Sequence, residues 1–138
     1  MSKVDLEFVS IEYREPIVYL RFKENVTLYG KEVKAIGEAC KKVTNGNKYL
    51  ALTDIETPLD ITPEGRKASA EGKNGKNIIA NAILVRRLGQ RLIANVYEEV
   101  NKPPFPIKVF TEEAEAEKWL LMHQEEYNLL AKSVNESY

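Results

Sequence analysis

Hydrophobic and polar side chains alternate at the start of this chain. In residues 6–13, Leu6 and Phe8 fall on one side of an extended backbone, and Val9 and Ile11 fall on the other. Residues 17–22 (Ile-Val-Tyr-Leu-Arg-Phe) form a second run rich in β-branched and aromatic residues. Both runs are typical of strands, and the short turn at residues 14–16 predicts an antiparallel hairpin.

The spacing of apolar residues then changes to that of a helix. Apolar side chains recur at helical intervals from residue 28 to about residue 43, which predicts an amphipathic helix with Thr27 as its cap. Asn45 and Gly46 tolerate a left-handed backbone and are expected to end this helix. Residues 49–53 (Tyr-Leu-Ala-Leu-Thr) are apolar without alternation, which indicates a strand covered on both faces.

A short polar helix is predicted to begin after residue 61. Thr62 is a good N-cap, Pro63 suits the first helical position, and Glu64 suits the positive end of a helix. The helix carries few apolar side chains before the glycines at positions 72 and 75, so we expect it to pack weakly and to be mobile.

The remainder of the chain repeats the strand–helix alternation. Residues 78–85 predict a buried strand, residues 87–100 an amphipathic helix, residues 107–110 a strand, and residues 111 to about 131 a final helix. The predicted order is ββαβαβαβα, an α/β fold with a mixed, mostly parallel five-stranded sheet. We expect one domain over residues 1–131, followed by a polar C-terminal tail at residues 132–138 that frays.

Composition and charge exclude several classes of protein. The 138 residues carry 20 basic and 21 acidic side chains, which argues against nucleic acid as a partner. The single cysteine, Cys40, permits no internal disulfide and is expected to be buried. The sequence shows no secretion signal and no apolar run long enough to span a membrane, so we expect a cytoplasmic protein.

The sequence contains no recognisable catalytic or cofactor motif. His123 is the only histidine, and it shares a helix face with Trp119 and Tyr127, which indicates a packing role. With one histidine and one cysteine, a transition-metal site is not expected. We therefore predict no enzyme activity, no cofactor and no metal.

Two groups of polar residues are candidate sites. Arg66 and Lys67 open one predicted helix, and Arg86, Arg87 and Arg91 open the next. In a parallel sheet both helix starts lie at the edge where ligands bind, so a shared anion or partner surface is one interpretation, and a solvated charged face is the other.

The second group is acidic. Asp54, Glu56 and Asp60 follow a strand, where catalytic carboxylates and magnesium ligands often lie, although solvation of a loop is the simpler interpretation.

Three stretches of the chain carry a family resemblance. They are residues 49–54 with residues 61–66 (Ile-Thr-Pro-Glu-Gly-Arg), residues 80–85 (Ala-Asn-Ala-Ile-Leu-Val), and residues 101–120, in which prolines, a strand and a Trp-Leu helix follow in a fixed order. The chain resembles STAS-like domains, more narrowly SpoIIAA-like STAS/SEC14 proteins of a Bacteroidetes-type branch. The resemblance implies a SpoIIAA/STAS-like fold and a binding or regulatory role.

In the anti-sigma-antagonist branch of that family, a hydroxyl at the start of the second helix is phosphorylated within a pattern close to Asp-Ser-Ser-Gly. Here the matching place reads Asp60-Ile-Thr-Pro-Glu, so the resemblance implies a phosphorylation site at Thr62, and a helix cap is the simpler reading.

We therefore expect a non-enzymatic interaction or regulatory module that binds an unknown protein partner. The alternatives are binding of a small anion, nucleotide or lipid at the helix N-termini, an enzyme that uses the acidic loop, and a homodimer formed through an exposed apolar helix face.

Overall fold

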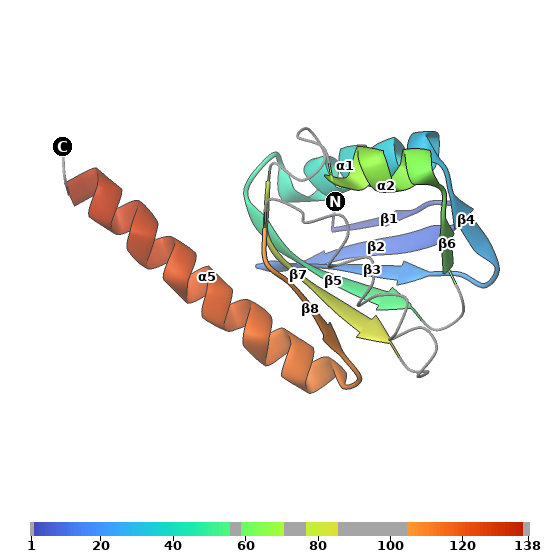
Figure 1. Cartoon of the computed structure of the whole chain (residues 1–138). Coiled ribbons are helices and arrows are strands. Elements are labelled where there is room, and N and C mark those ends of the chain that lie inside the picture. Colours follow the sequence, from blue (N-terminus) through green and yellow to red (C-terminus); the bar gives the residue numbers. More distant parts are fainter. Residues whose placement is uncertain (1, 56–58, 71–76, 86–104, 137–138) are drawn as a thin grey trace.

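The computed structural model describes residues 2–55, 59–70, 77–85 and 105–136, with only the backbone for residue 70 and for residues 130–136. A mixed sheet is its centre (Figure 1). The strands, in their order across the sheet, are β1 (Lys3–Asp5), β2 (Val9–Arg14), β3 (Ile17–Phe22), β5 (Tyr49–Ile55), β7 (Ile78–Val85) and β8 (Ile107–Phe110).

The first strands are antiparallel and the later ones are parallel. β2 pairs with β3 as the predicted hairpin, and the pairs β3–β5, β5–β7 and β7–β8 are all parallel. The α/β class and the five predicted strands are thus confirmed, but a sheet of five strands is wrong, because β1 adds a sixth. The run at residues 6–13 is broken near Leu6, whose N–H donates to the carbonyl of Val9 at 2.9 Å, so residues 3–5 fold back antiparallel on β2.

The alternating side chains of β3 supply two hydrophobic cores. Val18 and Leu20 belong to a cluster with Cys40 on one face of the sheet, and Ile17 and Tyr19 belong to a cluster on the other. In Figure 1, helices α1 and α2 lie on one side of the sheet and α5 lies on the other. The apolar run in β5 is explained by this arrangement, because both of its faces are covered.

Helix α1 (Gly30–Thr44) begins two residues later than predicted. Thr27 does not cap it: that residue lies in a short strand, β4 (Val26–Leu28), whose two apolar residues are buried. Tyr29 is the N-cap residue instead, and its N–H donates to Glu32 Oε1 at 3.3 Å. Asn45 ends the helix with a φ of 54°, as predicted.

Strand β4 pairs in parallel with β6 (Leu59–Ile61), forming a small second sheet that the sequence did not predict. Helix α2 (Pro63–Ala70) follows β6 and lies beside α1 (Figure 1). The expected weak packing of α2 is wrong at its first turn: Gly65 is buried, and a Cβ there would lie 2.5 Å from the carbonyl oxygen of Leu28.

The last described helix, α5 (Glu113–Glu136), is 24 residues and therefore about 36 Å long. Ala116 and Leu120 are buried against the sheet in the same cluster as Leu52 and Leu84. Beyond that contact the helix projects away from the sheet (Figure 1). The backbone is helical to Glu136 and thus includes most of the predicted tail. The helix predicted at residues 87–100 lies outside the described residues.

Candidate interaction surface

Asp54 and Asp60, two of the three candidate acidic residues, lie in strands of different sheets. Asp54 is the next-to-last residue of β5 and has 5% of its side chain exposed, and Arg21 Nη1 donates to its Oδ2 at 2.5 Å. Asp60 is exposed on β6 in the second sheet, and Glu56 lies outside the described residues. The same Arg21 nitrogen donates to Glu113 Oε1 at 3.0 Å. Asp54 is thus brought together with an arginine and with the start of α5.

A second contact fastens α5 to the same strand. The Tyr19 hydroxyl donates to Glu117, one helical turn after Glu113. Burial raises the pKa of Tyr19 to about 12, and the hydrogen bond and negative charge of Glu117 add to the effect. The guanidinium of Arg14 lies over the Tyr19 ring, 4.1 Å from its centroid.

We call Tyr19, Arg21, Asp54, Glu113 and Glu117 the α5 anchor. Burial disfavours the charged form of Arg21, but its hydrogen bonds to Glu113 and Asp54 outweigh that effect and raise its pKa. The charges in the anchor are therefore used to hold a helix on a sheet. Sequence reasoning missed it, although an arginine inside the apolar run at residues 17–22 was a visible signal for a buried carboxylate partner.

Thr62 is the N-cap of α2, as predicted. Its Oγ1 accepts the N–H of Gly65 at 2.9 Å and donates to the carbonyl of Leu28 at 3.3 Å. Its own N–H donates to the same carbonyl at 3.0 Å. The hydroxyl thus caps the first turn of α2 and also contacts β4, and a phosphoryl group on it would remove the O–H that donates to Leu28.

The candidate basic surface is described only in part. Arg66 is half-buried and Lys67 is exposed on α2, whereas Arg86, Arg87 and Arg91 lie outside the described residues. α2 begins beside the small sheet of β4 and β6 and not at a strand of the main sheet. Whether the two basic groups share a surface stays a prediction.

Four of the five exposed large apolar side chains among the described residues lie on helix α5. Leu121, Met122 and Leu129 are 48%, 52% and 62% exposed, and Tyr127 is 36% exposed. The helix face toward the sheet is packed in the ordinary way: Trp119 lies against Phe110, with 5.6 Å between the ring centroids. The exposed residues fall within nine consecutive positions in the middle of the same helix.

The predicted packing role of His123 is supported by its position. It is half-buried, and its ring meets that of Trp119 edge-on, with 4.5 Å between the centroids. Among the residues that the structure describes, no group of histidine, cysteine and acidic side chains has the arrangement of a metal site. No helix in the described ranges is long and apolar enough to cross a membrane.

Comparisons with known proteins give a family match and a structure of similar fold. The family model named "Domain of unknown function (DUF7793)" matches residues 10–124. A solved structure of an uncharacterised protein of the DUF3478 family from Shewanella loihica PV-4, described as having a SpoIIAA-like fold, is similar to this chain with a TM-score of 0.56. It is 23% identical, and the match covers 81% of this chain and 91% of that one. No curated protein matches the chain.

Proposed function

Because this chain belongs to the DUF7793 family and has a SpoIIAA-like fold, we propose that it is a non-enzymatic, STAS-like interaction or regulatory module whose working surface is the exposed side of α5. The observation that carries the proposal is the exposure of Leu121, Met122 and Leu129 on one helix. Gathered apolar side chains on a surface are the mark of a protein interface, whereas scattered ones are ordinary.

The charged groups favour protein binding over catalysis. Asp54, the buried member of the candidate acidic site, is in an ion pair with Arg21, which also holds Glu113. The start of each described helix has a carboxylate on or beside it, at Glu32, Glu64 and Glu113. A negative ligand would be repelled there, so the alternative of an anion, nucleotide or lipid at these helix starts has less support.

The narrower placement in a Bacteroidetes-type STAS/SEC14 branch and the cytoplasmic location stay predictions. Phosphorylation of Thr62 also stays a prediction. Its hydroxyl is occupied in the unmodified protein, so modification would remove the hydrogen bond that this hydroxyl donates to the carbonyl of Leu28.

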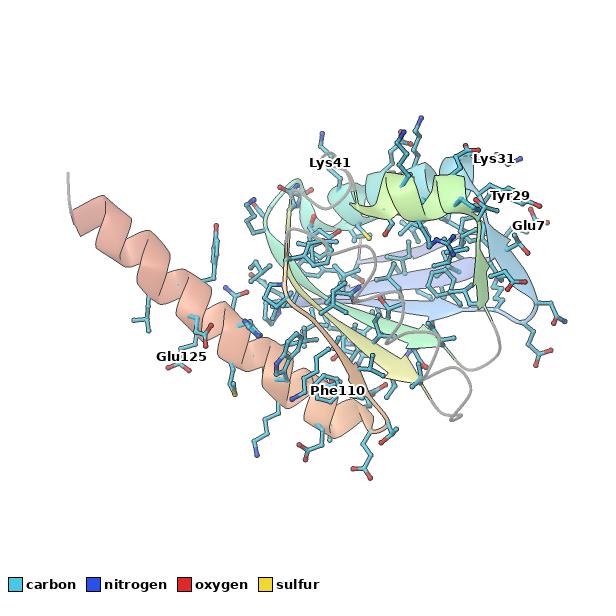
Figure 2. The ribbon with its side chains drawn as sticks, in the orientation of Figure 1. Glu7, Tyr29, Lys31, Lys41, Phe110 and Glu125 are labelled. Carbon is cyan, nitrogen blue, oxygen red and sulfur yellow. The ribbon has the colours of Figure 1, made fainter. Side chains whose placement is uncertain are left out.

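Photo-crosslinking tests the proposed surface. A benzoylphenylalanine placed at Met122 or Leu129 in the full chain, in the cells that make it, is expected to form a covalent adduct with a protein. The same group at Lys31, an exposed position on the outer side of α1, is the matched control and should form none (Figure 2). Mass spectrometry identifies the adduct. Equal labelling from all three positions, or no adduct from α5, would refute the proposal.

A further inference from the structure

The outer side of α5 has a pattern that reads the same in both directions. Six exposed residues form one stripe along it: Ala114, Lys118, Leu121, Met122, Glu125 and Leu129. Successive members are 4, 3, 1, 3 and 4 positions apart, so they lie on one side of the helix. Their chemistry follows the same symmetry, with apolar residues at both ends and in the centre and one charge between them on each side.

This symmetry matches the stripe to a second copy of itself. If two α5 helices lie antiparallel about a two-fold axis between Leu121 and Met122, Leu121 of one copy faces Met122 of the other. Lys118 then faces Glu125, and Ala114 faces Leu129. Each contact occurs twice in a two-fold interface, which gives two pairs of opposite charges around an apolar centre.

Neither a parallel pairing of two helices nor an ion pair within one helix brings Lys118 and Glu125 together. A parallel pairing would set Lys118 against Lys118 and Glu125 against Glu125, which repel. Within one helix the two charges are seven residues and about 10.5 Å apart along the axis, beyond the reach of the usual pairs three or four positions apart. Among the described residues neither side chain forms an ion pair.

The position of the stripe permits the pairing. Ala116 and Leu120, which pack on the sheet, lie on the opposite side of α5 from the stripe. Glu125 points away from the sheet in Figure 2. Two antiparallel helices joined through their stripes would therefore carry their sheets on the outside of the pair, where the sheets do not meet.

We propose that the partner of the α5 surface is a second copy of this chain, bound as an antiparallel homodimer through this stripe; the inference rests on the proposed function. The stripe spans about 24 Å of helix. Its six residues are fewer than the roughly 20–30 residues that each partner contributes to a standard interface, so we expect a weak dimer, with a dissociation constant on the order of 10 μM.

Reversal of charge tests both the dimer and its direction. Sedimentation equilibrium of the full chain from about 5 to 500 μM, at low salt, is compared for wild type, Lys118→Glu, Glu125→Lys and the double variant. Each single change sets like charges together twice, and we expect dimer affinity to fall at least tenfold. The double variant restores both pairs with reversed signs, and its affinity should return to within about threefold of wild type.

The control is a pair on α1 with the same charges and the same seven-residue spacing. Lys31→Glu and Glu38→Lys, both at exposed positions, should leave association unchanged. Circular dichroism verifies that every variant is folded. A wild-type chain that stays monomeric at 500 μM overturns the dimer, and a double variant as weak as the singles overturns the antiparallel arrangement. Either result leaves the proposed function intact if benzoylphenylalanine in place of Met122 still forms an adduct with a different protein.

Discussion

Replacing Gly65 by alanine tests how firmly α2 is attached. The new Cβ would lie 2.5 Å from the carbonyl oxygen of Leu28 and 3.1 Å from Cγ2 of Ile61. The first of these atoms belongs to the backbone of β4 and already accepts two hydrogen bonds from Thr62. The helix must therefore shift away from the strand, which weakens the hydrogen bonds that hold it there.

The expected change in the free energy of unfolding of Gly65→Ala is the sum of three contributions. Overpacking costs about 1–3 kcal/mol, loss of one hydrogen bond costs about 0.5–1.5 kcal/mol, and alanine in place of glycine returns about 1 kcal/mol in a helix. The net expectation is a loss of about 2 kcal/mol. For 138 residues this lowers the melting temperature by about 7 °C.

Gly30→Ala is the matched control, because a Cβ there also meets an atom at 2.5 Å. That atom is Oε1 of Glu64, the far end of a flexible and exposed side chain that can move aside. We expect this variant to stay within about 0.5 kcal/mol of wild type. Urea denaturation and calorimetry measure both. If Gly65→Ala is as stable as wild type, or if both variants lose the same stability, the backbone contact is not what limits α2.

Three further results are expected. Arg21→Met leaves the buried Asp54 carboxylate without its guanidinium and should lower the free energy of unfolding by on the order of 2 kcal/mol in urea titrations at pH 7. This loss is smaller than for a fully buried ion pair because Arg21 is partly exposed. Tyr19 has a pKa raised from 10.0 to about 12, so its contribution to stability is complete below pH 10 and is lost as pH rises toward 12. In urea titrations from pH 9 to pH 12, the free energy of unfolding should therefore fall less in Tyr19→Phe than in wild type. Thr62→Ala should cost about 1 kcal/mol by calorimetry, and an unchanged melting temperature would show that the cap contributes nothing.

Much of the fold was predictable because local patterns and tertiary packing agree. The buried run at residues 49–53 became β5, and the cap signals at Thr62 and Asn45 mark real helix ends. Thr27 misled the prediction because a good capping residue also suits a strand, and β4 exists only through its pairing with β6, 33 positions along the chain. Short strands of this kind leave little periodic signal in a sequence.

The candidate sites were less predictable than the fold. Asp54 was identified as a polar residue after a strand, but its role depends on Arg21 and Glu113, which are distant in sequence. The exposed stripe of α5 was hidden for a different reason. Leucine and methionine fit a core as well as a surface, and only the position of the sheet separates the two sides of the helix.

The two-sided use of β3 has a consequence for how this protein melts. Alternate residues of that strand belong to separate clusters, and Tyr49 and Leu50 of β5 divide between the same two clusters. If the helices on one face of the sheet detach, β3 and β5 lose the packing on that face. The same strands carry the core on the opposite face, so that core is destabilised as well. The two layers should therefore lose their structure together in one cooperative transition, even though the two clusters have no described residue in common.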